Sequence, residues 1–262
     1  MIGRGRGVDR LSRLNPLTRL ALIVIVTTPL LLSIDWVSAS VSLALTLVLV
    51  PFVGMTYTQL WRAGWPLALI APLSAVSMLL YGAPGGTEYF SFWLVKVTSN
   101  SVELAIAMAL RVLAVALPVI VLARGIDPTR LGDALGQILR LPERFVLGAV
   151  AGLRMITLFK DDWSSMERAR RARGLGDEGK IKRFATMTFG LLVLALRRGG
   201  KLSTAMEARG FGRAPVYAQS RTWARESRMG TADYWALAVG LLVAAAPVVV
   251  SVASGAWRFL GM

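Results

Sequence analysis

The chain has 262 residues, 55% of them hydrophobic, and a formal charge of +15 from 30 Lys and Arg against 15 Asp and Glu. A soluble domain usually contains about 45–50% apolar residues, so this composition favours a membrane protein. The sequence has no Cys and no His, which excludes disulfides, thiolate and imidazole metal ligands, cysteine nucleophiles and Ser-His triads. We therefore expect a non-catalytic membrane protein that binds no metal ion or cofactor itself, although metal binding by carboxylates alone stays open. The positive charge indicates anionic lipid, nucleic acid or an acidic protein as a partner.

Five apolar runs follow a basic arm of 19 residues. They cover residues 20–34, 37–55, 64–80, 102–123 and 234–253, and a spanning helix needs about 20 apolar residues. The first run resembles a signal peptide, with Val37-Ser38-Ala39 as a cleavage site. An uncharged second run begins at once, so a transmembrane hairpin is the better interpretation. The sequence predicts about five spans.

The positions of Lys and Arg predict the orientation and the division of the chain. The arm and the segment after the fourth run are basic, so both are expected in the cytoplasm. The predicted parts are the cytoplasmic arm, 1–19; a four-span region, 20–123; a cytoplasmic-side helical region, 124–232; and the last span with the C-terminus, 233–262. The whole chain is expected to be an all-α integral membrane protein.

The cytoplasmic-side region holds three predicted helices. From Arg154 to Arg228 it carries 17 Lys and Arg against 7 Asp and Glu. A short amphipathic helix is expected from Pro128 to Leu139. A long helix is expected to start at Pro142, which suits a first turn, and to end at Gly174. A second long helix is expected from about Ile181 to Arg209. Both long helices are apolar at first and charged near their ends.

The two long helices share an ending. Ala172-Arg173-Gly174-Leu175-Gly176 is repeated 36 residues later as Ala208-Arg209-Gly210-Phe211-Gly212. Glycine after the last helical residue adopts the left-handed conformation that caps a helix, and arginine is favourable at the negative helix end. Each ending is therefore a slim tip with one forked cation, suited to an acidic groove of a partner. The alternative is two well-capped helices with solvated arginines.

These residues carry a family resemblance. The endings follow Ser165-Met166-Glu167 and Ala205-Met206-Glu207, and the first long helix begins at Leu141-Pro142. In these motifs and in its run of spans, the chain resembles the transmembrane T component of energy-coupling factor (ECF) transporters. These transporters are ABC-type importers of vitamins and of nickel or cobalt ions. The resemblance implies a coupling subunit in a prokaryotic cell membrane, whose partners are two ATPase subunits, which bind ATP and Mg, and a substrate-binding S component.

The resemblance also assigns residues, and it makes the three helices of region 124–232 coupling helices. ATPase docking would fall on the two helix endings: Ala172, Arg173, Gly174, Glu207, Ala208, Arg209 and Gly210. The S component would rest on apolar residues of the coupling helices: Leu131, Leu135, Val146, Val150, Leu153, Phe184 and Leu191. We call these seven the predicted platform.

Gly148 and Gly152 predict where the two long helices cross. Their Gly-x-x-x-Gly spacing leaves one helix face without side chains, so that another backbone can approach. The alternative is ordinary packing of small residues between any two helices.

Other signals in the basic region are weaker. Gly174-x-x-x-x-Gly179-Lys180 imitates a phosphate-binding loop, but Ile181 stands where Ser or Thr should hold magnesium. The adjacent Asp161 and Asp162 point apart on a helix and are expected to be solvated or paired with Arg154, Lys160 or Arg168. The arginines from 168 to 173 have no aromatic residues among them, which favours anionic lipid over nucleic acid.

Two alternative functions place different demands on the sequence. One is a membrane-bound enzyme acting on anionic lipid or another phosphate-containing substrate, with arginines that clamp the phosphate. It needs a nucleophile or a cluster of acids, and the region offers only Asp161, Asp162 and Glu167 beside its arginines. The other is a self-contained secondary transporter, which needs polar residues within several spans. Arg111, inside the fourth run, has no assigned role.

Overall fold

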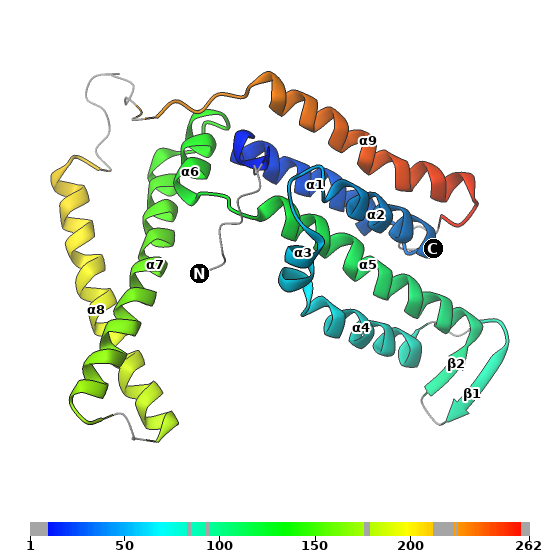
Figure 1. Ribbon diagram of the computed structural model, residues 1–262, viewed down its shortest axis with the longest axis horizontal. Coiled ribbons are helices and arrows are strands. Elements are labelled where there is room, and N and C mark those ends of the chain that lie inside the picture. The colour runs from blue at the N-terminus through cyan, green and yellow to red at the C-terminus, as the bar shows by residue number, and fades with distance from the viewer. Residues whose placement is uncertain are drawn as a thin grey trace. The chain divides into compact units, whose positions relative to one another are not determined.

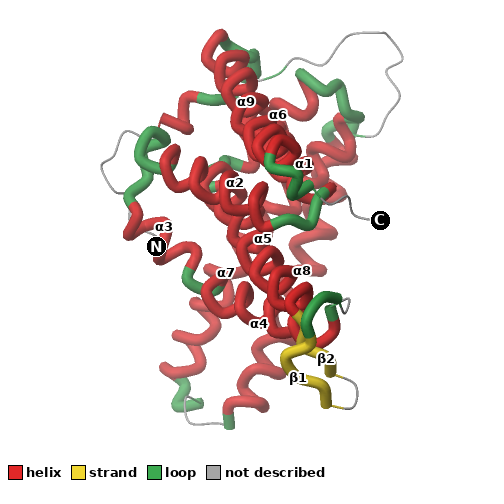
Figure 2. Tube along the Cα trace, turned by 90° about the vertical axis from the view of Figure 1, so that its right-hand side faces the viewer, coloured by secondary structure: helices red, strands yellow, loops and turns green. Residues whose placement is uncertain are grey.

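The computed structural model describes residues 10–82, 85–92, 95–175, 179–211, 223 and 225–257. The arm up to Asp9 and the last glycine of each repeated ending, Gly176 and Gly212, lie outside the described residues. The chain divides into two compact units, one of residues 1–126 with 228–262 and the other of residues 127–227. Figure 2 shows helices throughout both units and one small hairpin of strands, so the predicted helical class is confirmed.

The first unit is built mainly from four packed helices. α1 (Pro16–Leu32) and α2 (Trp36–Leu49) each pack against both α5 (Ser99–Ala123) and α9 (Thr231–Ala253), as Figure 1 shows. α3 (Tyr57–Gly64) and α4 (Leu67–Tyr81) also contact α5. The last helix of the chain thus joins a bundle that begins with the first, and a short 3-10 helix, η1 (Arg10–Arg13), precedes α1.

Helices occupy all five predicted apolar runs, but they differ in length. Among the described residues, α5 and α9 are each long and apolar enough to cross a membrane. α3 and α4 meet that criterion only as a pair, with a bend of 55° between them. α1 and α2 are apolar but shorter, with 17 and 14 residues. Pro66 directly precedes α4 and suits the break, because proline has no backbone N–H to continue the helix from α3.

Polar side chains fix the ends of the bundle helices. The backbone N–H of Asn15 donates to the buried Asp233 carboxylate at 2.8 Å, which joins the start of α1 to the start of α9. The buried Arg19 guanidinium donates to the carbonyl of Leu122 at 2.9 Å and also to that of Arg124. The last carbonyls of a helix have no partner within it, so Arg19 satisfies the end of α5.

A second polar group lies at the turn between α1 and α2. Asp35 caps α2 by accepting from the backbone N–H of Ser38 at 2.7 Å, and it also accepts from the hydroxyl of Ser251 in α9 at 2.6 Å. Arg111, the arginine of α5, is half-buried in the same bundle. Arg111 is therefore placed in a helix bundle that contains a counter-charge, as expected for an arginine in an apolar span.

The hairpin, like the short helices η1 and α3, is an element that we did not predict. β1 (Glu88–Phe92) pairs antiparallel with β2 (Val95–Thr98), with Glu88 opposite Thr98 and Phe92 opposite Val95. A bulge interrupts the register between Glu88 and Phe90. Aromatic and β-branched residues favour strands, so Tyr-Phe-Ser-Phe and Val-Lys-Val-Thr carried a signal that we did not use.

The second unit contains the three predicted helices of the basic region. α6 spans Pro128–Gln137, α7 Glu143–Ala172 and α8 Lys180–Ala208. The predicted bounds are confirmed within one or two residues. Asp127 caps α6 through the N–H of Thr129, with Pro128 in the first turn. Trp223 packs on Gly136, and Gln137 bonds the backbone of Arg225 and Ser227, which fastens the returning chain to α6.

Candidate functional site

The end of α7 is closed by its own backbone. Arg173 caps the helix, and its N–H donates to the carbonyls of Ala169 and Arg170 at 3.2 and 3.1 Å. Gly174 has a φ of +74° and donates to Arg171, and the N–H of Leu175 reaches back to Arg170 at 3.1 Å. This pair of bonds around a left-handed glycine is the Schellman motif.

The end of α8 repeats this geometry. Arg209 caps the helix, and its N–H donates to Ala205 and Met206 at 3.2 and 3.1 Å. Gly210 has a φ of +77° and donates to Glu207, and Phe211 donates back to Met206, both at 2.9 Å. The repeated sequence therefore makes one repeated structure, and the predicted glycine caps are confirmed.

The predicted docking residues lie on the surface of their unit. Ala172, Arg173 and Gly174 are exposed, and so are Glu207, Ala208, Arg209 and Gly210. No described atom lies within 4 Å of the position that a Cβ would take on Gly174 or Gly210. Each helix thus ends in an accessible guanidinium group. Such a group can donate two parallel hydrogen bonds to a facing carboxylate.

The two ends differ in charge. The last turn of α7 contains Arg170 and Arg171, whereas that of α8 contains no basic residue. Glu207 stands three residues before its glycine, and the matching position in α7 holds Arg171. Arg171 donates to Glu167 at 2.7 Å, so the glutamate of the first helix lies one turn further back. The backbone of the two tips is equivalent, but their surroundings are not.

α7 and α8 cross near the loop that connects them, as Figure 1 shows. Met166 Cε lies 2.8 Å from the position that a Cβ would take on Gly190. The ring of Trp163 packs on Phe184 with centroids 5.7 Å apart. Two ion pairs join the same segments, Asp162 with Arg198 at 2.5 Å and Glu167 with Arg183 at 3.2 Å. We call these residues the crossing.

The crossing corrects two predictions. Gly148 and Gly152 have no described atom within 4 Å of a Cβ, so they do not form the close approach that their spacing indicated. The small residue that does is Gly190 of α8, which stands opposite a flexible methionine. Asp162 is paired across the helices with Arg198, whereas we expected a solvated side chain or a pair with Arg154, Lys160 or Arg168.

Packing against α6 buries part of the predicted platform and leaves other residues of it exposed. Val146 is 5% exposed and Val150 half-buried, because both lie against Gly132 of α6. Val146 is thus a core residue of its unit, and its place on a partner surface was wrong. Leu131, Leu135 and Leu191 are half-buried, whereas Leu153 and Phe184 are 46% and 63% exposed. Other apolar residues of α7 and α8 are exposed and were not assigned: Phe145, Ile156, Phe189, Leu192 and Leu196.

A groove lies between the first half of α7 and the end of α8. It has a volume of about 760 Å³, and the predicted docking residues Arg209 and Gly210 belong to its wall with Phe211. Arg154 contributes a second cation, and Leu147, Val150 and Met206 contribute apolar surface. The second helix end thus lies beside a hollow lined by two cations and by apolar side chains.

Comparisons with known proteins agree with this arrangement. A model of the family CbiQ, described as cobalt transport protein, matches residues 7–218. Among curated proteins, the energy-coupling factor transporter transmembrane protein EcfT of Limosilactobacillus fermentum is 28% identical over 195 residues, which cover 70% of this chain and 71% of that protein. The EcfT proteins of Leuconostoc gelidum and Brevibacillus brevis are 26% and 25% identical, over 80% and 83% of this chain and 83% and 88% of theirs.

The match of the family model covers both repeated endings up to Gly212 and all three helices of the second unit. The chain therefore belongs to the CbiQ family, the transmembrane T components of energy-coupling factor transporters.

Proposed function

We propose that this chain couples two ABC-type ATPase subunits to a small S component that binds the substrate. The observation that carries the proposal is the repeated helix end, in which an exposed arginine caps a long helix just before a left-handed glycine. Each tip would enter a groove on one ATPase subunit. The relatives bear the name of ECF transmembrane proteins, which supports assembly with the other ECF components.

ATP hydrolysis would take place in the partner subunits, which hold ATP and Mg, and this chain would transmit the resulting movement. The crossing supports this division of work, because two ion pairs, one ring pair and one close contact join α7 to α8. When the ATPases draw the tips together, a joint of this kind passes the motion from one long helix to the other.

The S component would rest on the exposed apolar residues of α7 and α8. Leu153, Ile156, Phe184, Phe189 and Leu196 are all exposed. Large exposed apolar side chains in one unit mark an interaction surface. The transported substrate would be a vitamin or a transition-metal ion, bound by the S component. The N-terminus and the second unit would lie on the cytoplasmic side of a prokaryotic cell membrane.

Purification of the complex from its native membrane tests the proposal. The full chain is extracted in mild detergent, and the co-purifying chains are identified by mass. We expect nucleotide-binding subunits together with a small membrane protein, and we expect Arg173→Glu with Arg209→Glu to lose the nucleotide-binding subunits. Removing one partner of a buried charge pair costs about 2–5 kcal/mol, and reversal costs more.

Arg197→Glu provides the matched control, because Arg197 is an exposed arginine of α8 that lies away from the tip. That variant should keep every partner. A chain that purifies alone, or a double variant that retains its nucleotide-binding subunits, would contradict the proposal. A solitary chain would direct attention to the enzyme alternative and to assays on anionic lipids.

A further inference from the structure

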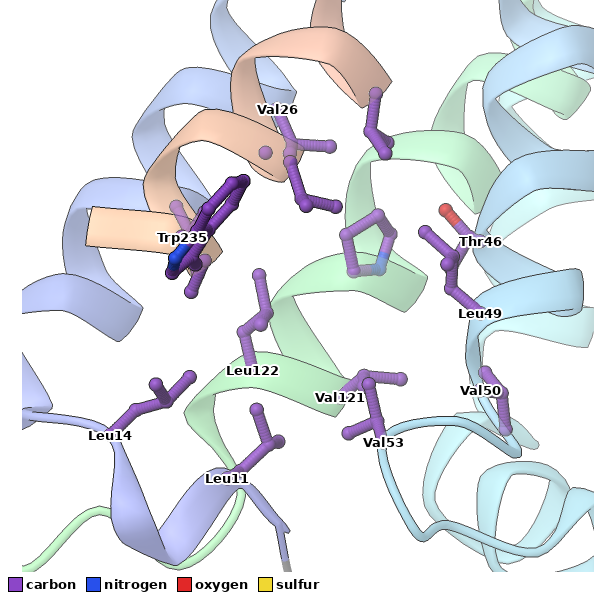
Figure 3. Close-up of a pocket in the computed structure, with 16 residues that line it drawn as sticks. Leu11, Leu14, Val26, Thr46, Leu49, Val50, Val53, Val121, Leu122 and Trp235 are labelled. Atoms are coloured by element: carbon purple, nitrogen blue, oxygen red, sulfur yellow. The ribbon is translucent and has the colours of Figure 1, made fainter. Parts of the chain in front are cut away.

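The first unit contains a cavity among α1, α2, α5 and α9 that the coupling function does not use. Its volume is about 330 Å³, and Figure 3 shows its lining. Leu22 and Val26 come from α1, Val50 follows α2, and Val121 comes from α5; all four are buried. With the exception of Thr46, the side chains in its wall are apolar or absent.

A cavity of this kind selects an apolar occupant. An apolar cavity of about 150 Å³ already stays dry and takes up small apolar molecules. This one is larger, so an empty cavity would deprive its walls of many contacts. Its α9 wall is open to the surroundings, because Trp235 and Val239 are 74% and 48% exposed. In a membrane, the apolar molecules outside that wall are lipid chains.

Cations gather at the end of the bundle where the cavity begins. Leu11 and Leu14 line the cavity, and the exposed Arg13 stands between them in the chain. Leu122 also lines it, and Arg124, two residues later, is half-buried and donates one guanidinium N–H to Gln59 Oε1 at 2.9 Å. Asn15 donates to the carbonyl of Arg228, which brings that residue to the same end.

The acid at the start of α9, Asp233, is used inside the bundle. Asp233 is 4% exposed and accepts from the backbone N–H groups of Asn15 and Gly230, both at 2.8 Å. Trp235, which is exposed at the same end of α9, has an apolar ring and a polar N–H, and such residues are enriched at membrane interfaces. Arginines and an exposed tryptophan are thus found at this end of the bundle.

We propose that this cavity holds one acyl chain of an anionic phospholipid, whose headgroup lies against Arg13, Arg124 and Arg228. The apolar wall selects the chain, and the guanidinium groups select the phosphate by charge-assisted hydrogen bonds. The site is separate from the helix ends of the second unit.

Photolabelling in nanodiscs tests the site. The full chain is reconstituted with phosphatidylglycerol that carries a diazirine on one acyl chain, and in parallel with the matching phosphatidylcholine. Labelled peptides are mapped by mass. We expect label in 11–26, 46–53, 118–122 and 235–243, stronger from phosphatidylglycerol. Arg13→Gln should weaken the preference for phosphatidylglycerol about fivefold, as expected for one cation near an anionic lipid surface.

One pair of variants on α9 separates occupancy of the cavity from labelling of the outer surface. Ala236 lines the cavity, whereas Ala238 is exposed and does not. Ala236→Phe should remove the label from the wall, and Ala238→Phe should leave it. The wild-type comparison of the two lipids needs no variant, so the test survives if Ala236→Phe fails to fold.

Two results would overturn the proposal. Equal labelling by both lipids would refute a site for anionic phospholipid. Unchanged wall labelling in Ala236→Phe would refute occupancy of the cavity. Neither result depends on whether ATPase subunits bind the helix ends, so the proposed function stands or falls by its own experiment.

Discussion

The Asp162 carboxylate of α7 accepts two hydrogen bonds from the Arg198 guanidinium of α8, at 2.5 and 3.3 Å. The bidentate geometry fixes the two side chains more firmly than a single contact does. Glu167 and Arg183 form a second pair nearer the connecting loop, and Met166 meets Gly190 in the same region. Among the described residues, these contacts join the two long helices between the connecting loop and their distant ends.

A double-mutant cycle measures the Asp162–Arg198 pair. Asp162→Asn should lower the free energy of unfolding by about 1 kcal/mol, because the side chains are 22% and 32% exposed and solvent screens part of the attraction. Arg198→Gln in the Asp162→Asn background should then cost little more. Thermal unfolding in detergent provides the values.

Asp161→Asn is the control for that cycle, since Asp161 is exposed and its side chain makes none of the crossing contacts. Its unfolding midpoint should match the wild type. Additive effects of the Asp162 and Arg198 substitutions would show that the pair contributes no coupling energy.

Glycine substitutions distinguish the observed crossing from the predicted one. Gly190→Leu should destabilise the second unit by about 1–3 kcal/mol, because extra atoms are forced against Met166. Gly148→Ala should instead stabilise it by about 0.5–1 kcal/mol, since Gly148 lies in a helix with open space beside it. Thermal unfolding of the two variants gives the comparison. A neutral Gly190→Leu with a disruptive Gly148→Ala would return the crossing to the first half of α7.

The capping glycines should resist substitution. Gly174→Ala and Gly210→Ala each place a Cβ on a residue with a φ of +74° or +77°. A left-handed L-residue costs about 1–2 kcal/mol, so each variant should unfold earlier or fray at the tip. Hydrogen exchange at the N–H groups of Leu175 and Phe211 reports the fraying directly.

Gly179→Ala is the matched control, because Gly179 precedes α8 with a φ of −50°, which alanine adopts freely. Its exchange at the two tips should be unchanged. Equal protection of Leu175 in wild type and Gly174→Ala would mean that the left-handed cap does not stabilise the tip.

The sequence was informative where local signals suffice. Proline and glycine mark the ends of α6, α7 and α8, and the predicted bounds agree closely with the structure. The left-handed conformation of Gly174 and Gly210 was predictable for the same reason, since a cap is decided within a few residues.

Contacts between distant residues were not predictable in this way. Gly-x-x-x-Gly spacing shows where a backbone can be approached, but not which helix approaches it. The crossing predicted at Gly148 and Gly152 was therefore wrong. Gly190, which lies opposite Met166, is a single glycine and belongs to no spacing motif that a sequence reader could recognise. Val146 and Leu153 look alike in the chain, and only the packing of α6 buries the first and exposes the second.

Site-specific photo-crosslinking from the helix ends tests the central claim most directly. Leu175 and Phe211, which directly follow the capping glycines, are each replaced by p-benzoylphenylalanine, and the full chain is irradiated in its native membrane. The exposed Lys201, two turns before the end of α8, serves as the control position. We expect both tip positions to crosslink to a nucleotide-binding subunit and position 201 to do so much less. Tips that crosslink to no nucleotide-binding protein, or no more than position 201 does, would contradict the coupling function.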